Sequence, residues 1–256
     1  MIAAEEIVAA LESFADEKQR QNLMRFFKTG KGDYGEGDCF LGLKVPQTRA
    51  VVKEARLEVP FGEIEKLLDS RWHEARLAGF LLLVEEMLTA LPKSKDTPMK
   101  HASRRDELAG FYLRHARRAN NWDLVDMTCP KILGNWLLYP GADGSLPDRA
   151  ILDKLVASDN LWEQRIGIVT TWKLIQKGQF DDTLRLAEKL LDHPHDLIHK
   201  ATGWMLREVG KKDMDVLRDF LHEHSSRMPR TALRYAIEKM KPSERKYWLD
   251  VPRSLK

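Results

Sequence analysis

The chain has 256 residues, of which 43% are hydrophobic and 32% charged, and its formal net charge at pH 7 is +3. This composition excludes an intrinsically disordered chain and leaves enough apolar residues for a sizeable core. The small net charge neither requires nor excludes a nucleic-acid partner, since that depends on basic side chains gathered on one face. Two cysteines, Cys39 and Cys129, are too few for a disulfide framework or a zinc site. The N-terminal stretch lacks the features of a secretory signal, and we expect a cytoplasmic protein.

Apolar residues recur at spacings of three and four along almost the whole chain, which predicts an all-α fold. Pro46, Pro147 and Pro229 each precede an amphipathic run, where proline suits the first turn of a helix. In chain order, the expected helices cover residues 2–15, 17–29, 46–57, 61–69, 72–89, 103–118, 122–138, 148–157, 160–177, 180–192, 196–210, 212–223, 229–240 and 243–249.

Three segments share one plan, in which a leucine-rich helix end and a short polar break precede a helix that opens with a charged residue. They are LLDSRWHEARLAGFLLLVEEM (67–87), LVASDNLWEQRIGIVTTWKLI (155–175) and LLDHPHDLIHKATGWMLREVG (190–210). Recurring helix pairs predict an α-solenoid of HEAT-like repeats that forms a curved superhelix, and a non-repetitive helical bundle is the alternative. We expect one domain over residues 1–256, with a core of roughly 17–240 and a C-terminal tail of 241–256.

The first residues of the inner helices of a solenoid tend to line its concave face. In this chain these openings carry Arg76, Trp122, Arg165, Lys200 and Arg230. The repeated cations predict a basic stripe, which suits a phosphate backbone, an acidic protein segment or plain solvent. The pattern alone does not choose among these three.

Several short motifs resemble binding sites for a nucleotide or a metal, but their sequence context does not support binding. GKGDYG (30–35) has the spacing of a dinucleotide-binding loop, but a helix instead of a strand precedes it, and a flexible loop is expected. HPH (193–195) and HEH (222–224) lack further ligands of the kind that a metal site needs. We therefore expect neither a metal nor a cofactor.

The segment NNWDLVDMTCP (120–130) opens one of the expected helices. Asn120 and Asn121 suit the capping position, and Asp123 in the first turn is explained by the helix dipole. Trp122 and Asp126 lie four residues apart and should share a face of the helix. The dipole does not account for Asp126, because this residue lies beyond the first turn.

Trp204 occupies a comparable place, four residues after Lys200 at the opening of another inner helix. If the two helices are neighbours in the solenoid, Trp122, Asp126 and Trp204 converge on one cleft. Two indole faces and a carboxylate make a site that favours a cation.

The chain resembles the HEAT-like-repeat alkylpurine DNA glycosylases of the AlkD family over roughly residues 20–240. The matching motifs are FLGLKVPQTRAVVKEA (40–55), WDLVDMTCPKILGNWLL (122–138), SDNLWEQR (158–165) and IHKATGWMLREVGK (198–211). The resemblance implies a monomeric, cofactor-free repair enzyme that excises N3- and N7-alkylated purines from duplex DNA held in a concave face. It also implies that the damaged base is not flipped into a pocket, unlike in most glycosylases.

The same resemblance assigns roles to individual residues. Trp122, Asp126 and Trp204 match the catalytic positions. The residues expected to contact DNA are Arg165, which matches a residue at the DNA backbone, together with Lys200, Phe26 and Arg49.

Two departures from the family pattern leave alternatives open. Phe26 stands where the family commonly has a tyrosine, and the GKGDYGEGD loop is longer than in the best-known members, so DNA contacts near 26–38 are in question. One alternative is a DNA-binding relative without glycosylase activity, specific for branched or distorted DNA. The other is a protein-binding HEAT scaffold.

Overall fold

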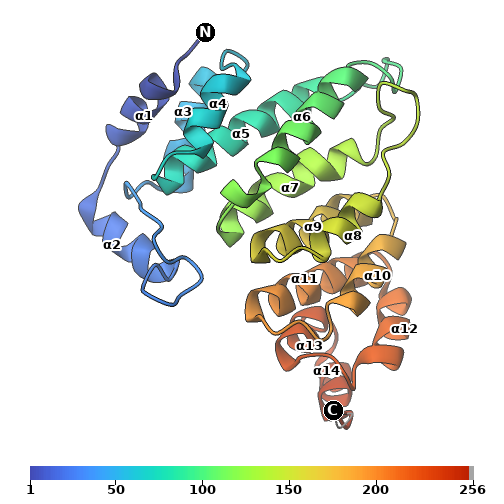
Figure 1. Ribbon diagram of the computed structural model, residues 1–256. Coiled ribbons are helices and arrows are strands. Elements are labelled where there is room, and N and C mark those ends of the chain that lie inside the picture. Colours follow the sequence, from blue (N-terminus) through green and yellow to red (C-terminus); the bar gives the residue numbers. More distant parts are fainter. Residues whose placement is uncertain (254–256) are drawn as a thin grey trace. The chain divides into compact units, whose positions relative to one another are not determined.

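A computed structural model describes residues 1–253, and every regular element among them is a helix (Figure 1). The helices are α1 (Ala4–Glu12), α2 (Glu17–Phe26), α3 (Val45–Ala55), α4 (Phe61–Leu68), α5 (His73–Ala90), α6 (Ala102–Arg114), the short 3-10 helix η1 (Ala116–Arg118), α7 (Trp122–Trp136), α8 (Ala150–Val156), α9 (Leu161–Ile175), α10 (Asp181–Lys189), α11 (Asp196–Lys212), α12 (Met214–His224), α13 (Arg230–Ala236) and α14 (Pro242–Asp250). An isolated β-bridge joins Cys39 and Trp72. The predicted all-α fold is confirmed, and each expected helix is present with its ends shifted by a few residues.

Each of the three segments that share one sequence plan folds as a short helix followed by a longer one. The pairs are α4–α5, α8–α9 and α10–α11, and the two helices of each pair pack on one another. Glycine allows this close approach in two of them: a Cβ atom at Gly79 would lie 2.9 Å from Leu68 Cδ2, and one at Gly167 would lie 2.7 Å from Val156 Cγ2. The predicted recurrence of helix pairs is therefore confirmed.

The chain divides into two compact units, an N-terminal unit over Met1–Pro147 and a C-terminal unit over Asp148–Lys256. The single domain expected from the sequence stays a prediction, because a division into compact units does not measure whether the units fold together.

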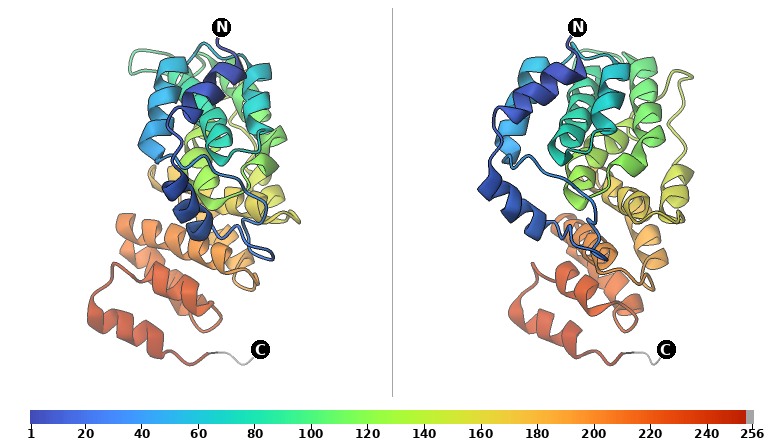
Figure 2. Two further views of the ribbon diagram at one scale, coloured as in Figure 1. Left: turned by 90° about the vertical axis from the view of Figure 1, so that its left-hand side faces the viewer. Right: turned by 60° about the vertical axis from the view of Figure 1, so that its left-hand side comes forward.

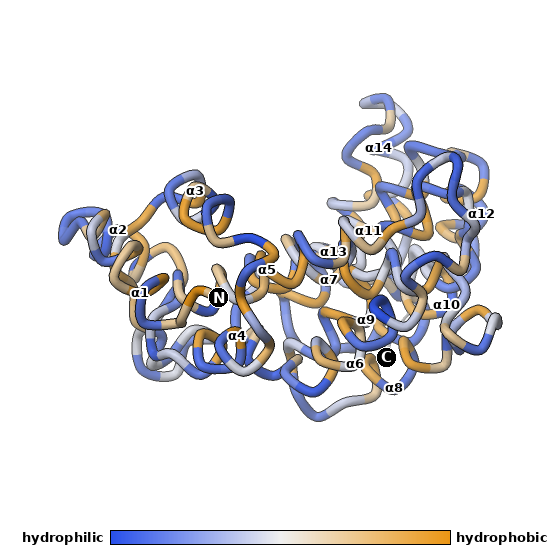
Figure 3. The backbone as a smooth tube through the Cα atoms, turned by 90° about the horizontal axis from the view of Figure 1, so that it is seen from above, coloured by the Kyte–Doolittle hydropathy of each residue, from blue (hydrophilic) through white to orange (hydrophobic). Residues whose placement is uncertain are grey.

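Helix α2 is the most sparsely packed element of the N-terminal unit. Asp16 caps it by accepting a hydrogen bond from the backbone N–H of Gln19 at 2.8 Å. None of its residues is buried, and the tube coloured by hydropathy is largely hydrophilic there (Figure 3). It lies at the margin of the unit (Figure 2). Such a helix is held by few apolar contacts and opens locally at low cost in free energy.

The C-terminal unit has its own apolar core, which continues into the expected tail. Trp248 of α14 is 3% exposed and packs in the cluster that includes Leu217 and Leu233. Residues 242–250 are thus a packed helix, whereas 254–256, also part of the expected tail, lie outside the described residues. Within residues 1–253, no helix is both long enough and apolar enough to cross a membrane.

Candidate active site

Helix α7 begins as its sequence predicts and carries the two residues singled out for catalysis. The side-chain oxygen of the N-cap Asn121 accepts a hydrogen bond from the backbone N–H of Trp122 at 2.9 Å. Trp122 and Asp126 are both partly exposed, and both line one cavity of about 390 Å³. We call it the Trp122 cavity; its walls come from α2, α3, α5, α7 and the segment before α3. The prediction that Trp122 and Asp126 share a face of α7 is confirmed.

The indole of Trp122 belongs to a group of aromatic rings in the wall of this cavity. Phe27 stacks on Trp122 with ring centroids 5.2 Å apart and planes inclined by 28°, and it stacks in turn on Phe40 at 5.2 Å. The edge of Phe26 meets Trp122 at 5.8 Å, while Phe26 itself is 62% exposed. Neighbouring rings hold the indole in one orientation, and Phe26 offers a further ring at the rim.

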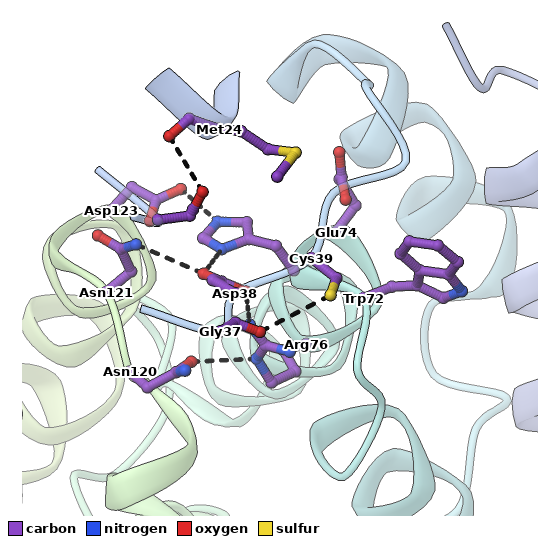
Figure 4. A network of polar contacts seen from close by, with 12 residues as sticks. Met24, Gly37, Asp38, Cys39, Trp72, Glu74, Arg76, Asn120, Asn121 and Asp123 are labelled. Atoms are coloured by element: carbon purple, nitrogen blue, oxygen red, sulfur yellow. Dashed lines mark hydrogen bonds and ion pairs between the residues drawn. The ribbon is translucent and has the colours of Figure 1, made fainter. Parts of the chain in front are cut away.

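A buried ionic network fixes the first turn of α7 (Figure 4). His73, at the start of α5, lies 2.8 Å from Asp38 through Nδ1 and 2.9 Å from Asp123 through Nε2. All three side chains are almost completely buried. The network therefore ties the end of the long loop at Asp38 and the start of α7 at Asp123 to one ring of α5.

His73 is charged at neutral pH. Burial by itself lowers the pKa of His73, but the carboxylates of Asp123 and Asp38 outweigh it and raise this pKa to about 9. Burial by itself raises the pKa of Asp38. The hydrogen bond and charge of His73, together with the charge of Arg76, lower this pKa by more, so that the net shift is downward. His73 is consequently an imidazolium between two carboxylates.

Arg76 completes the network from the next turn of α5. Its Nη2 contacts Asp38 Oδ1, its Nε donates to Asn120 Oδ1 at 3.1 Å, and its Nη1 donates to the backbone oxygen of Ser70 at 2.7 Å. Arg76 is only 6% exposed. Its predicted place in a basic stripe is therefore wrong, because its guanidinium is buried and paired with Asp38 inside the N-terminal unit.

Glu74 anchors a second segment beside the cavity. Its carboxylate accepts hydrogen bonds from the backbone N–H groups of Leu41, Gly42 and Leu43 at 2.9, 2.9 and 3.1 Å. Gly42 has a φ of +99°, and a Cβ atom there would lie 2.1 Å from the backbone oxygen of Asp16. The segment before α3 is thereby pinned between α5 and the start of α2.

Sequence reasoning missed this network and misread two of its members. The sequence predicts a flexible loop at GKGDYG (30–35), whereas Asp38 at the end of the same loop is buried and paired. Asp123 was explained by the helix dipole, which holds for its position but leaves out its contact with His73. The available signal was the charged sequence His73-Glu74-x-Arg76 at the opening of an otherwise apolar helix, since buried charges require partners.

The remaining residues assigned to DNA binding lie as follows. Arg49 is exposed, with Nη2 3.9 Å from Met127 Sδ beside the cavity. In the C-terminal unit, Lys200 pairs with Asp196 at 2.8 Å. Arg165 is 5% exposed and donates from Nη1 to the backbone oxygen of Leu197 at 2.6 Å, which joins α9 to α11. The contacts of all these residues with DNA stay predictions.

Trp204, the third residue assigned to catalysis, lies on α11 of the C-terminal unit. It is partly exposed, and its indole Nε1 donates to Glu208 Oε1 at 3.2 Å. Its convergence with Trp122 and Asp126 stays a prediction. As for metals, residues 1–253 contain no group of three or more His, Cys, Asp or Glu side chains that could hold an ion.

Comparison with known proteins connects this fold to DNA repair. A family model described as "DNA alkylation repair enzyme" matches residues 7–240. Among solved structures, one similar chain is the "Predicted DNA alkylation repair enzyme from Enterococcus faecalis", with 15% identity, a TM-score of 0.62 and coverage of 89% of this chain and 97% of that chain. At this identity the likeness shows the fold alone. No curated protein matches the chain.

Proposed function

The chain belongs to the family of DNA alkylation repair enzymes, and we propose that it is a glycosylase acting on positively charged N3- and N7-alkylated purines in duplex DNA. Its reaction is the hydrolysis of the N-glycosidic bond, and the damaged base is not flipped before cleavage. In this proposal the protein acts as a cytoplasmic monomer without a cofactor.

The observation that carries the proposal is the pair Trp122 and Asp126 on the wall of one cavity. An alkylated purine is cationic and leaves readily, and positive charge builds on the deoxyribose as the bond to C1′ breaks. The face of Trp122 stabilises such charge by about 0.5–2 kcal/mol. A preorganised carboxylate at Asp126 contributes about 3–4 kcal/mol by comparison with other fixed charges in dry sites.

The bonds and charges balance without a strong acid. The electron pair of the broken bond stays on the purine, so the cationic lesion leaves as a neutral base. A water oriented by Asp126 supplies the oxygen that bonds to C1′, and its proton passes to Asp126 and then to solvent. Because the leaving group is already activated, a catalytic histidine is not needed.

The two carboxylates of α7 take different roles in this scheme. Oδ2 of Asp123 is held by His73, and Asp123 is 6% exposed, which assigns it to positioning α7. Asp126 is partly exposed and accessible to a water and a sugar. Trp204 is proposed as the second indole, and Phe26, Arg49, Arg165 and Lys200 as contacts to the duplex.

The test is release of 7-methylguanine and 3-methyladenine from methylated duplex DNA under single-turnover conditions. We expect Asp126→Asn to lower the rate about 100- to 1,000-fold and Trp204→Ala to lower it about 2- to 30-fold. Asp219→Asn, an exposed carboxylate on α12, is the matched control and should leave the rate unchanged. Wild-type release no faster than the spontaneous rate would refute the glycosylase.

The same preparation separates the alternatives. A DNA-binding family member without glycosylase activity binds branched DNA more tightly than alkylated duplex in a competition experiment and releases no base. A protein-binding scaffold shows no affinity for either DNA.

A further inference from the structure

Two histidines of the HPH motif (193–195) hold the turn between α10 and α11 through their ring nitrogens. Nδ1 of His193 accepts a hydrogen bond from the backbone N–H of His195 at 3.0 Å, and Nδ1 of His195 accepts one from the backbone N–H of Leu197 at 3.1 Å. His195 is thereby the N-cap of α11, a place that serine, threonine, asparagine or aspartate usually takes. The two bonds satisfy backbone N–H groups at the start of α11 that have no partner inside the helix.

Both hydrogen bonds require neutral imidazole rings. A backbone N–H group can only donate, so each Nδ1 must carry a lone pair and the ring proton must lie on Nε2. The contact of His193 with α9 agrees with this arrangement, because its Nε2 lies 2.8 Å from Oε1 of Gln164, an acceptor. A second proton on either ring would occupy Nδ1 and break the bond that this atom accepts.

The surroundings of the two rings oppose a second proton. Besides each other, the rings face the charged or titratable groups Arg165 on α9 and Asp196, His199 and Lys200 on α11. Burial is the largest cause that lowers the pKa of both His193 and His195 below the ordinary 6.5, and the positive groups add to it against the effect of Asp196. The stabilisation by neutral rings is therefore fully present above pH 6.5, and it is lost as the pH falls through the lowered pKa values. Both rings are partly exposed, so protons from solvent can reach them.

The first turn of α11 also holds two residues that are proposed to contact DNA. Arg165 donates from Nη1 to the backbone oxygen of Leu197 at 2.6 Å, and Lys200 pairs with Asp196 at 2.8 Å. Leu197 is the residue whose backbone N–H is capped by His195. Loss of the cap therefore loosens the turn to which both cationic side chains are attached.

We propose that His193 and His195 are positioning residues, whose neutral rings fix the first turn of α11 and with it the DNA contacts of Arg165 and Lys200. This inference rests on the proposed function, which assigns these two cations to the duplex. Acidification protonates the rings, opens the turn and weakens binding of the duplex. Added positive charge on its own would strengthen binding to phosphates, so the sign of the pH effect separates positioning from charge.

The first test compares three side chains at position 195. Asparagine is a strong N-cap that does not titrate in this range, and alanine cannot cap. NMR-detected hydrogen exchange, corrected for the intrinsic pH dependence of exchange, measures protection of the Leu197 amide at pH 7.5 and pH 5.0. We expect this protection to fall about 2- to 30-fold in wild type on acidification. It should stay constant in His195→Asn and be low at both pH values in His195→Ala.

The second test measures the affinity for an unmodified duplex by fluorescence anisotropy at constant ionic strength and the same two pH values. Wild type should lose about 2- to 10-fold in affinity relative to His195→Asn on going from pH 7.5 to pH 5.0. His222→Gln, in which an exposed histidine of α12 is replaced, is the matched control and should follow wild type. Binding by wild type that is as tight as that of His195→Asn at pH 5.0, or tighter, would overturn the positioning role. Absence of duplex binding at pH 7.5 would overturn it as well.

Failure of this inference is distinguishable from failure of the glycosylase, because neither measurement requires release of a base. A wild-type protein that binds the duplex with the expected pH dependence but releases no base would refute the glycosylase alone. Equal protection of the Leu197 amide at pH 7.5 and pH 5.0 in wild type would refute the histidine cap, whatever the rate of base release.

Discussion

The imidazolium of His73 makes the stability of the protein depend on pH in a direction opposite to that of paired carboxylates. Its pKa is raised from an ordinary 6.5 to about 9 by Asp123 and Asp38, against the effect of burial. Below pH 6.5 the ring is protonated in both the folded and the unfolded chain, and its stabilisation is fully present. Between pH 6.5 and 9 only the folded chain holds the proton, and above about 9 the stabilisation is lost.

The size of this effect follows from the two pKa values. At roughly 1.4 kcal/mol for each tenfold change, the difference between 6.5 and about 9 corresponds to about 3 kcal/mol of unfolding free energy. We expect that contribution to disappear between pH 6 and pH 9.5 in urea unfolding followed by far-UV circular dichroism. His73→Gln should be less stable at pH 6 and should lack this pH dependence.

Comparison between variants isolates the contribution of the one ring. Every other titratable group is the same in wild type and in His73→Gln, so its effect cancels in the difference. His222→Gln, which replaces an exposed histidine on α12, should keep the wild-type dependence. An equal fall in stability for wild type and His73→Gln would refute the assignment of a charged His73 between two carboxylates.

Two further substitutions test the packing around the site and between the helices. Glu74→Gln removes the charge that accepts three backbone N–H groups and should destabilise the protein by about 1–3 kcal/mol, whereas Glu54→Gln on the exposed face of α3 should change stability little in the same thermal unfolding measurement. Gly167→Ala places a Cβ atom 2.7 Å from Val156 Cγ2 and should cost about 1–3 kcal/mol. Gly62→Ala meets no described atom within 4 Å and should be neutral or stabilising, and equal effects at the two glycines would contradict the close approach of α8 and α9.

The helices could be predicted from the sequence because their signal is local. Apolar spacing located every helix, and the differences from the structure lie at the ends of the elements. The helix expected over 17–29 ends at Phe26, ahead of Lys28, whose φ of 51° is left-handed. The helix expected over 103–118 ends at Arg114 and continues as the short η1.

The site was only partly predictable, because its contacts are not local. The shared face of Trp122 and Asp126 follows from a spacing of four. His73 contacts Asp38 and Asp123, which are 35 and 50 positions away from it in the sequence. Helical periodicity does not predict contacts over such separations. The loop that brings Asp38 to His73 has no pattern from which its path can be read.

The error at Arg76 has a physical cause that applies to other solenoids. The prediction treats a charged residue at the opening of a helix as facing solvent, as on an amphipathic helix. Helix α5 is apolar around most of its surface and is buried along its length. A charge on such a helix is buried with it and must be paired, so charged residues on α5 indicate partners instead of a binding face.

The first turn of α5 therefore determines the shape of the Trp122 cavity from two sides. His73 holds the start of α7, which carries Trp122 and Asp126, and Glu74 holds the segment before α3 that forms another part of the wall. Side chains of adjacent residues on a helix point about 100° apart. The adjacent residues His73 and Glu74 can therefore contact α7 and the segment before α3 at the same time. Helix α2 forms one wall of the cavity but has no buried residue. It is therefore less stable locally than the walls that are hydrogen-bonded to α5, and we expect α2 to be the wall that moves when a ligand binds.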